Sequence, residues 1–285
     1  PKALFLPQSE VMLKYSKLGQ AEMAEQAQTK RVIFGIHACD SKGVHLLDTV
    51  FATEKNTDPY WTTRRENTVV IGIGCNEPCP TCFCTSVQSG PFGSQAMDAI
   101  CTDLGDSYHV RTIGKKALPY FSHLEHTTPE QDRQAKGLQE KAIFGIEHAF
   151  PVKGLKQKLD ANFDSPYWQT ISESCLGCGI CTFLCPTCFC FDIVDEAQRS
   201  ERVRNWDTCM FRTYSLETSG HNPRPTKRER TRQRVMHKFS YWLDHINKIG
   251  CTGCGRCVRY CPVGLDIRAM LRTASELESE VSHAG

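Results

Sequence analysis

Two cysteine runs in the second half of the chain have a spacing that can hold iron–sulfur clusters. Both follow the pattern C-x2-C-x2-C-x3-C-P. The first run supplies Cys175, Cys178, Cys181 and Cys185, and the second supplies Cys251, Cys254, Cys257 and Cys261. This is the ligand run of bacterial ferredoxins, in which three thiolates hold one [4Fe–4S] cluster and the fourth holds the other cluster. The chemistry indicated is single-electron transfer.

The ferredoxin pattern predicts which cysteines act together. One predicted [4Fe–4S] cluster is held by Cys175, Cys178, Cys181 and Cys261, and the other by Cys251, Cys254, Cys257 and Cys185. The alternative is a pair of four-cysteine zinc sites. Zinc usually takes two separate C-x2-C pairs, and it requires neither the third cysteine nor the trailing Cys-Pro. The pattern therefore favours two iron–sulfur clusters.

The first half of the chain contains a second group of cysteines. Cys39 and Cys75 follow two predicted strands, and the loop CNEPCPTCFC adds Cys79, Cys82 and Cys84. Carboxyl ends of parallel strands open at the same edge of a sheet, so this loop is a plausible site for a third cluster. The predicted ligands are Cys39, Cys75, Cys82 and Cys84, with Cys79 as the alternate. A zinc site and reduced buried thiols remain alternatives.

The hexapeptide CPTCFC occurs twice, at 79–84 and 185–190. In the second copy the leading Cys185 is already a predicted cluster ligand. Cys188 and Cys190 are then left over, together with Cys209. These three could pack around a cluster as small apolar groups and tune its potential, and a fourth cluster is the alternative. The two hexapeptides are thus predicted to supply different ligands: the leading Cys185 in the second copy, and the trailing Cys82 and Cys84 in the first.

Hydrophobic patterning indicates how these cysteines are positioned. The apolar run at 31–36 predicts a short strand and the run at 68–74 a buried one, separated by a helix over 41–51. Residues 98–111 predict a strand, a turn and a strand. Alternating strands and helices favour a small, mostly parallel sheet. The predicted class is α+β, with an α/β domain over 1–150 and a helical dicluster domain over 151–285. Connecting helices are expected over 127–160, a helix is expected to begin at DSPYW, and a long helical insertion is expected at about 191–250.

Composition narrows the function classes. The chain has 285 residues, a net charge of +2 and 17 cysteines, an odd number that cannot all pair. No apolar run is long enough to span a bilayer and no secretory pattern is present, so cysteine clusters of this kind favour a reducing, cytoplasmic compartment. The chain begins at Pro1, and we expect a trimmed N-terminus.

The segment from Arg224 to Lys238 contains seven Lys and Arg residues. A basic run with aromatic residues can bind nucleic acid. One hypothesis is therefore a zinc-stabilised module that binds nucleic acid through this run. The alternative, which we prefer, is a solvated helix face or a docking surface for an acidic partner. No nucleic-acid partner is therefore expected.

The segments FGIHACD, GCNEPCPTCFCTS, CPTCFCFDI, WDTC and CTGCGRCVRYCPVGLDI together resemble the 4Fe-4S dicluster electron-transfer subunits. That family includes the electron-transfer iron–sulfur component of anaerobic sulfite reductase and the beta subunit of cytoplasmic NAD(P)-linked nickel–iron sulfhydrogenases. The resemblance implies an electron relay between a flavin subunit that handles NAD(P)H, or a ferredoxin, and a catalytic nickel–iron or sirohaem subunit. It also implies that the eight ferredoxin cysteines are ligands. Cys79 stands where the family often has another residue, which favours leaving it out.

Catalysis by this chain alone is the competing hypothesis. An open N-terminal cluster could reduce a disulfide or sulfur compound. The sequence offers no nucleophile–base pair, the histidines are scattered, and we expect His37 and His237 to be ordinary packing or surface residues. No dinucleotide or P-loop motif is present. The sequence therefore favours an anaerobic electron-transfer subunit that is not catalytic by itself.

Overall fold

The structure is a computed structural model that describes residues 1–285 except 18, 27, 56, 148 and 278–285. Its contacts divide the chain into two compact units. The first unit comprises Pro1–Leu6, Glu25–Ala149 and Thr252–Cys254, and the second comprises Pro7–Ala24, Phe150–Cys251 and residues 255–277. Both units mix helices with a sheet, which agrees with the predicted α+β class. Residues 7–24 were expected in the first domain but belong to the second unit.

The first unit contains a four-stranded sheet of order β3-β4-β5-β6. Its strands are β3 (Arg31–Ile36), β4 (Thr68–Ile73), β5 (Ala99–Asp103) and β6 (Tyr108–Thr112). The first three are parallel and β6 is antiparallel to β5. These strands lie where the apolar runs predicted them. β4 and β5 are the two interior strands and are largely buried, as expected for the apolar run of β4 with strands on both sides.

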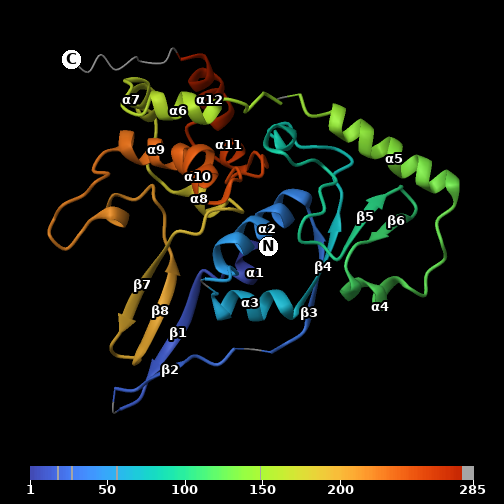
Figure 1. Ribbon diagram of the computed structural model, residues 1–285, viewed down its shortest axis with the longest axis horizontal. Coiled ribbons are helices and arrows are strands. Elements are labelled where there is room, and N and C mark those ends of the chain that lie inside the picture. Colours follow the sequence, from blue (N-terminus) through green and yellow to red (C-terminus); the bar gives the residue numbers. More distant parts are fainter. Residues whose placement is uncertain (18, 27, 56, 148, 278–285) are drawn as a thin grey trace. The chain divides into compact units, whose positions relative to one another are not determined.

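Helices connect and cover these strands (Figure 1). They are α1 (Lys2–Phe5), α2 (Ala38–Phe51), α3 (Pro59–Glu66), η1 (Cys84–Val87), η2 (Lys115–Ala117), α4 (Leu118–Phe121) and α5 (Pro129–Phe144). Asp58 caps α3 by accepting hydrogen bonds from the backbone N–H groups of Tyr60 and Trp61. The fully buried Trp61 stacks on Phe51 and donates from Nε1 to Asp48 at 2.8 Å.

The second unit contains an antiparallel sheet of order β2-β1-β8-β7. Its strands are β1 (Ser9–Tyr15), β2 (Ala21–Met23), β7 (Phe191–Glu196) and β8 (Glu201–Trp206), which extend side by side in Figure 1. The insertion at 191–250 therefore begins as a β-hairpin, and the expectation that it is helical is wrong for this part. Both strands of the hairpin contain β-branched residues, and β1 supplies the partner strand that makes the hairpin part of a sheet.

Short helices form the rest of the second unit. They are α6 (Leu155–Ala161), α7 (Tyr167–Ser172), α8 (Ile180–Phe183), η3 (Arg212–Ser215), α9 (Lys227–Met236), η4 (His237–Tyr241), α10 (Trp242–Ile246), α11 (Arg256–Arg259) and α12 (Ile267–Glu276). α9 begins with a capping box between Thr226 and Glu229. It continues through η4, a π-helical turn, into α10. No helix in the described part of the chain has both the length and the apolar character needed to cross a membrane.

A buried ion pair holds the N-terminal strand to the hairpin. The Glu10 carboxylate on β1 pairs with the Arg204 guanidinium on β8, and both side chains are almost fully buried. We expect Glu10→Ala to lower the free energy of unfolding by about 3–5 kcal/mol, because it leaves a buried guanidinium without its carboxylate. Urea unfolding followed by circular dichroism measures the loss.

Tyr15→Phe in the same strand is the matched control, since it removes only an exposed hydrogen bond to Asp195. It should cost at most about 1 kcal/mol. Equal stability of the Glu10→Ala and Tyr15→Phe proteins would show that the ion pair does not hold the sheet together.

Candidate iron–sulfur sites

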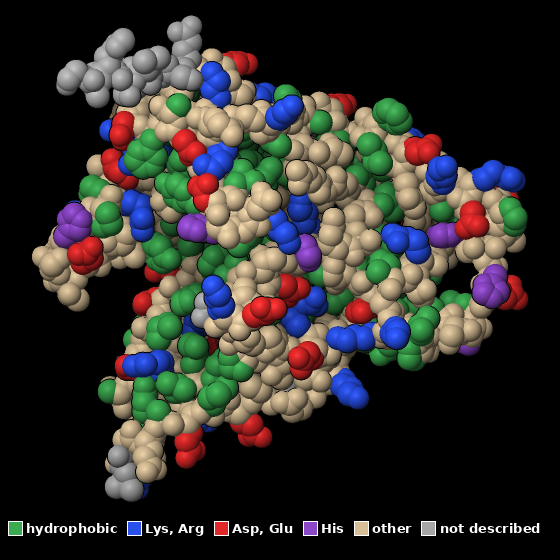
Figure 2. All heavy atoms as spheres, in the orientation of Figure 1, with side chains coloured by type: hydrophobic (Ala, Val, Ile, Leu, Met, Phe, Trp, Pro, Cys, Tyr) green, Lys and Arg blue, Asp and Glu red, His purple; other side chains and the backbone are tan. Residues whose placement is uncertain are grey.

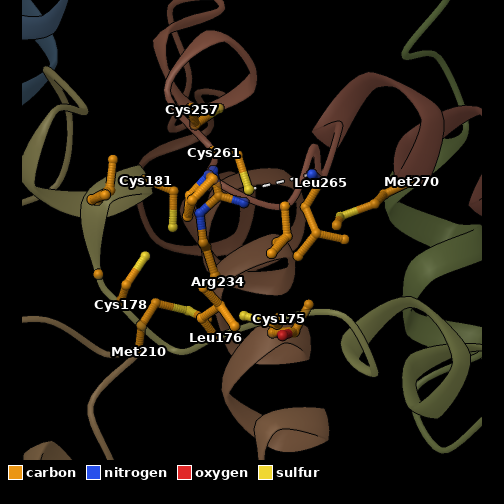
Figure 3. Close-up of a pocket in the computed structure, with 15 residues that line it drawn as sticks. Cys175, Leu176, Cys178, Cys181, Met210, Arg234, Cys257, Cys261, Leu265 and Met270 are labelled. Atoms are coloured by element: carbon orange, nitrogen blue, oxygen red, sulfur yellow. Dashed lines mark hydrogen bonds between the residues drawn. The ribbon is translucent and has the colours of Figure 1, made fainter.

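One pocket in the second unit gathers cysteines from both ferredoxin motifs (Figure 3). The cysteines that line it are Cys175, Cys178, Cys181, Cys257 and Cys261. Cys261 comes from the second motif, yet it lies in the same pocket as the three leading cysteines of the first. The remaining lining is largely apolar and includes Met210, Leu265 and Met270. These side chains limit the access of water to the sulfurs.

Left-handed glycines explain how each motif turns its cysteines inward. Gly179 (φ +75°) directly precedes α8, and Gly255 (φ +69°) directly precedes α11. A side chain at Gly179 would be strained by this φ and would place its Cβ 2.9 Å from Thr208 Cγ2. The tight turns also allow backbone N–H groups to reach sulfur. Gly177 N–H donates to Cys175 Sγ at 3.4 Å and Leu265 N–H to Cys261 Sγ at 3.2 Å.

A buried arginine lies among these sulfurs. Arg234 on α9 is 7% exposed and lines the pocket, with its guanidinium near Cys181 and Cys261 in Figure 3. Burial by itself lowers the pKa of a guanidinium. The pKa of Arg234 nevertheless lies well above its ordinary value, because nearby cysteine sulfurs stabilise the positive charge. These are the sulfurs of Cys181, Cys257, Cys188 and Cys185. Its Nε has no hydrogen-bond partner among the described residues. A buried cation of this kind requires an anionic neighbour.

A buried lysine contacts the fourth cysteine of the first motif. Lys238 Nζ donates to Thr187 Oγ1 at 2.9 Å, to Gly250 O at 3.1 Å and to Cys185 Sγ at 3.3 Å. Burial lowers the pKa of this ammonium group, but sulfurs of Cys185, Cys188 and Cys251 raise it well above its usual range. The pKa of Cys185 is lowered in turn by hydrogen bonding from Cys188 and by the Lys238 charge. Cys185 and Cys251, two of the ligands predicted for the second cluster, thus both lie near Lys238.

The basic run therefore differs from its predicted role. Arg230, Arg234 and Lys238 are each less than 9% exposed, so the segment is not simply a solvated face, and these three cations cannot form a surface for nucleic acid. On the face shown in Figure 2, Lys and Arg side chains are interspersed with Asp and Glu. Lys238 lies in the π-helical turn η4, and such turns are frequent at functional sites. The sequence alone did not predict that Arg234 and Lys238 lie beside the cysteines. The only sequence signal was their spacing of four residues, which places both on one face of a helix.

The structure brings together the cysteines that follow β4. The pKa of Cys75 is raised to about 11, first by burial and then by the nearby sulfurs of Cys82 and Cys79. The pKa of Cys84 is raised to about 12 by burial and by Cys82 and Cys75. Four sulfurs from this loop, those of Cys75, Cys79, Cys82 and Cys84, thus influence one another. A metal or cluster would relieve the cost of placing their thiolates together.

Two other residues adjoin this loop at the carboxyl ends of the strands. Cys39 lies in the first turn of α2, with its Sγ 3.9 Å from the Asp40 carboxylate. His37 Nδ1 is 3.5 Å from Cys75 Sγ and 3.2 Å from Ile73 O. The sequence placed Cys39 and Cys75 at the same sheet edge but assigned His37 no contact with cysteine. In the part of the chain that is described, no group of three or more His, Cys, Asp or Glu side chains has a geometry that holds a single metal ion.

The segment Thr252–Cys254 of the second ferredoxin motif packs on this loop within the first unit. Phe83 N–H donates to Gly253 O at 2.8 Å, and Cys82 Sγ lies 3.9 Å from Cys254 O. A Cβ at Gly253 would lie 2.5 Å from Cys84 Cα and 2.6 Å from Cys84 N. Backbone atoms cannot move aside as a flexible side chain does, so this position excludes any side chain.

We expect Gly253→Ala to lower the free energy of unfolding by about 2–5 kcal/mol, from overpacking and from its left-handed φ of +67°. Thermal unfolding and iron content of the anaerobically purified protein measure the effect. Gly264→Ala is the matched control, because Gly264 has φ +68° with nothing within 4 Å of a Cβ. If both variants lose the same stability, the packing on Cys84 contributes nothing.

The comparisons with known proteins agree with the cysteine geometry. A family model described as a 4Fe-4S dicluster domain matches residues 174–265. The chain is 34% identical to the sulfhydrogenase 2 subunit beta of Pyrococcus furiosus over 273 residues, which cover 93% of this chain and 80% of that protein. No solved structure matches the chain significantly. With both ferredoxin motifs inside the matched domain and a relative this similar over almost its whole length, the chain belongs to the family of 4Fe-4S dicluster electron-transfer subunits.

Proposed function

We propose that this chain relays single electrons between an electron-input partner and the catalytic subunit of a hydrogenase-type complex. The observation that carries the proposal is the pocket that holds Cys175, Cys178 and Cys181 together with Cys261 around the buried Arg234. Three cysteines of one motif with the fourth of the other is the ligand arrangement of a two-cluster ferredoxin. The relative named as a sulfhydrogenase subunit supports the assignment to a hydrogenase-type complex.

The residues of the pocket suit iron–sulfur clusters. When bound, each cluster accepts and releases one electron. The chain supplies thiolates as ligands, an apolar lining that lowers the local dielectric constant, and N–H donors to Cys175 and Cys261 Sγ. Arg234 and Lys238 offset the negative charge of thiolate-bound iron. The proposed ligands are the predicted ones: Cys175, Cys178, Cys181 and Cys261 for one cluster, and Cys251, Cys254, Cys257 and Cys185 for the other.

A third cluster is part of this proposal. Its proposed ligands are Cys39, Cys75, Cys82 and Cys84, with Cys79 as the alternate fourth ligand. The mutual influence of the Cys75, Cys82 and Cys84 sulfurs supports the last three of these positions. A ligand run at the carboxyl edge of a parallel sheet is the usual place for a bound group in an open α/β fold.

The proposed partners follow from the absence of a recognisable nucleotide motif in the sequence and from the family. The input partner is a subunit that carries flavin and oxidises NAD(P)H, or a ferredoxin. The output partner is a catalytic metalloenzyme subunit of the nickel–iron hydrogenase type, with a sirohaem sulfite reductase as the alternative. The proposed location is the cytoplasm, because a reducing compartment keeps cysteine thiols available as ligands.

Anaerobic purification of the complex with its partners tests the proposal. Iron and acid-labile sulfide should amount to at least about eight irons per chain for the two ferredoxin clusters, with about four more for the third. Reduction by NAD(P)H through the partner should produce electron paramagnetic resonance signals of reduced clusters. Fewer than about eight irons, or clusters that no partner reduces, would contradict the proposal.

The fourth ligand of the third cluster can be assigned by two single substitutions. We expect Cys39→Ser to lower the iron content by up to about four per chain and Cys79→Ser to leave it unchanged. Cys101→Ser, in the buried core of the sheet, is the control for a cysteine that holds no iron. The reverse result, with loss in Cys79→Ser alone, would assign the position to Cys79.

A further inference from the structure

A second cavity in the second unit is lined by the three cysteines that the ferredoxin motifs leave over. Its volume is about 300 Å³, and its lining includes Cys188, Cys190 and Cys209. Cys209 is buried, and Cys188 and Cys190 are half-buried. None of the three is a ligand of the clusters proposed above. A cavity of this volume accommodates a group much larger than a single metal ion.

The β7–β8 hairpin explains why these cysteines meet. Phe191 at the start of β7 pairs with Trp206 at the end of β8. The backbone N–H of Asp207 then donates to Cys190 O at 2.9 Å, just outside the ladder. The segment before β7 and the segment after β8 are therefore adjacent, and Cys190 and Cys209 come to line the same cavity. Cys188 lines the same cavity.

The charged residues that line the cavity are all cations. They are Arg224, Arg234 and Lys238, and the described lining contains no Asp or Glu. Arg234 and Lys238 are each more than 90% buried. The Arg234 Nε is left without a hydrogen-bond partner among the residues described. Buried cations beside three thiols fit an anionic group bound through thiolates, since an uncompensated buried charge is costly.

We propose that Cys188, Cys190 and Cys209 bind an additional iron–sulfur cluster, separate from the two ferredoxin clusters and from the cluster proposed in the first unit. The chain supplies three thiolates, which leaves one iron of a four-iron cluster for a ligand other than cysteine. The backbone N–H of Cys188 donates to Cys185 O at 3.4 Å, but Cys185 is the proposed crossing ligand of a ferredoxin cluster, so it is not counted here.

Arg234 relates this cluster to the ferredoxin pair. Its side chain lines both the cavity at Cys188, Cys190 and Cys209 and the pocket at Cys175, Cys178, Cys181 and Cys261. One guanidinium thus separates the two sites. This proximity allows one electron to pass between the additional cluster and a ferredoxin cluster, with no other reactant required. The second CPTCFC copy then serves two clusters, through Cys185 and through Cys188 and Cys190.

Single serine substitutions in the full chain, purified anaerobically with its partners, test the inference. We expect Cys190→Ser and Cys209→Ser each to lose up to about four irons per chain, or to keep the iron and change the spectrum of one cluster, because serine replaces a sulfur ligand by oxygen. Signals of the ferredoxin clusters should persist in both variants. Cys101→Ser, a buried cysteine in the sheet core of the first unit, should match the wild type in iron and spectrum.

Wild-type iron content and unchanged Mössbauer and electron paramagnetic resonance spectra in both variants would overturn the inference. So would mass spectrometry showing a Cys190–Cys209 disulfide in the active complex, since those thiolates would then be unavailable. Because the ferredoxin signals are followed separately, failure here is distinct from failure of the proposed relay. Loss of all clusters in Cys209→Ser would indicate unfolding, and the milder Cys190→Ser spectrum then decides.

Discussion

Replacing Cys261 with serine is expected to remove the cluster of the first ferredoxin motif, although Cys261 belongs to the second motif. Cys261 lines the same pocket as Cys175, Cys178 and Cys181, and its Sγ accepts a hydrogen bond from Leu265 N–H at 3.2 Å. Loss of this thiolate should lower the iron content by up to about four per chain. It should also reduce electron flow through the complex to background, because one relay step is missing.

The comparison with two other variants makes this prediction specific. Cys178→Ser should remove the same electron paramagnetic resonance signal as Cys261→Ser, and Cys251→Ser should remove a different one. Donor-to-acceptor turnover of the complex measures the loss of relay. If Cys261→Ser and Cys251→Ser instead abolish the same signal, each motif holds its own cluster and the crossed arrangement is wrong.

Replacing Lys238 with methionine is expected to lower the reduction potential of the cluster that Cys185 ligates. Lys238 Nζ donates to Cys185 Sγ at 3.3 Å and remains protonated because sulfurs surround it. A buried positive charge stabilises the reduced, more negative cluster, so its removal makes reduction harder. A charge-assisted hydrogen bond is worth about 1.5–3 kcal/mol, which for one electron corresponds to a shift on the order of 65–130 mV.

Redox titration followed by electron paramagnetic resonance measures this shift. Lys227→Met is the control, since Lys227 is exposed and its Nζ donates to the backbone oxygen of Glu173 rather than to a sulfur. It should leave every potential unchanged. A Lys238→Met protein with full iron content and wild-type potentials would show that the ammonium group serves packing alone.

The sequence by itself determined the local features of this protein. The apolar runs predicted β3 and β4 within one residue of their ends, because short runs rich in β-branched and aromatic residues favour strands. The eight ferredoxin cysteines were identified from spacing alone, since ligand spacing within a motif is a property of a short segment. The helix that begins within DSPYW, at Tyr167, followed from a proline at its start.

The tertiary structure decided what depends on residues far apart in the chain. β1 pairs with β8 about 190 residues later, so no local pattern could show that the insertion begins as a hairpin within a sheet. The basic run at α9 gave the composition of a solvated face, but Arg234 and Lys238 are buried among sulfurs from other segments. The tertiary packing of the chain, rather than the sequence pattern, determines whether such a cation faces solvent or is buried beside anionic groups.

The same reason applies to the cysteines. Spacing identified Cys188, Cys190 and Cys209 as surplus, but only the hairpin register brings them to one cavity with two buried cations. Gly253 appeared in the sequence as an ordinary motif glycine, and only the approach of Cys84 to within 2.5 Å of its missing Cβ shows why no side chain fits. The local sequence shows which cysteines can act as ligands. The charge and the volume around each cysteine arise from contacts that only the folded chain makes.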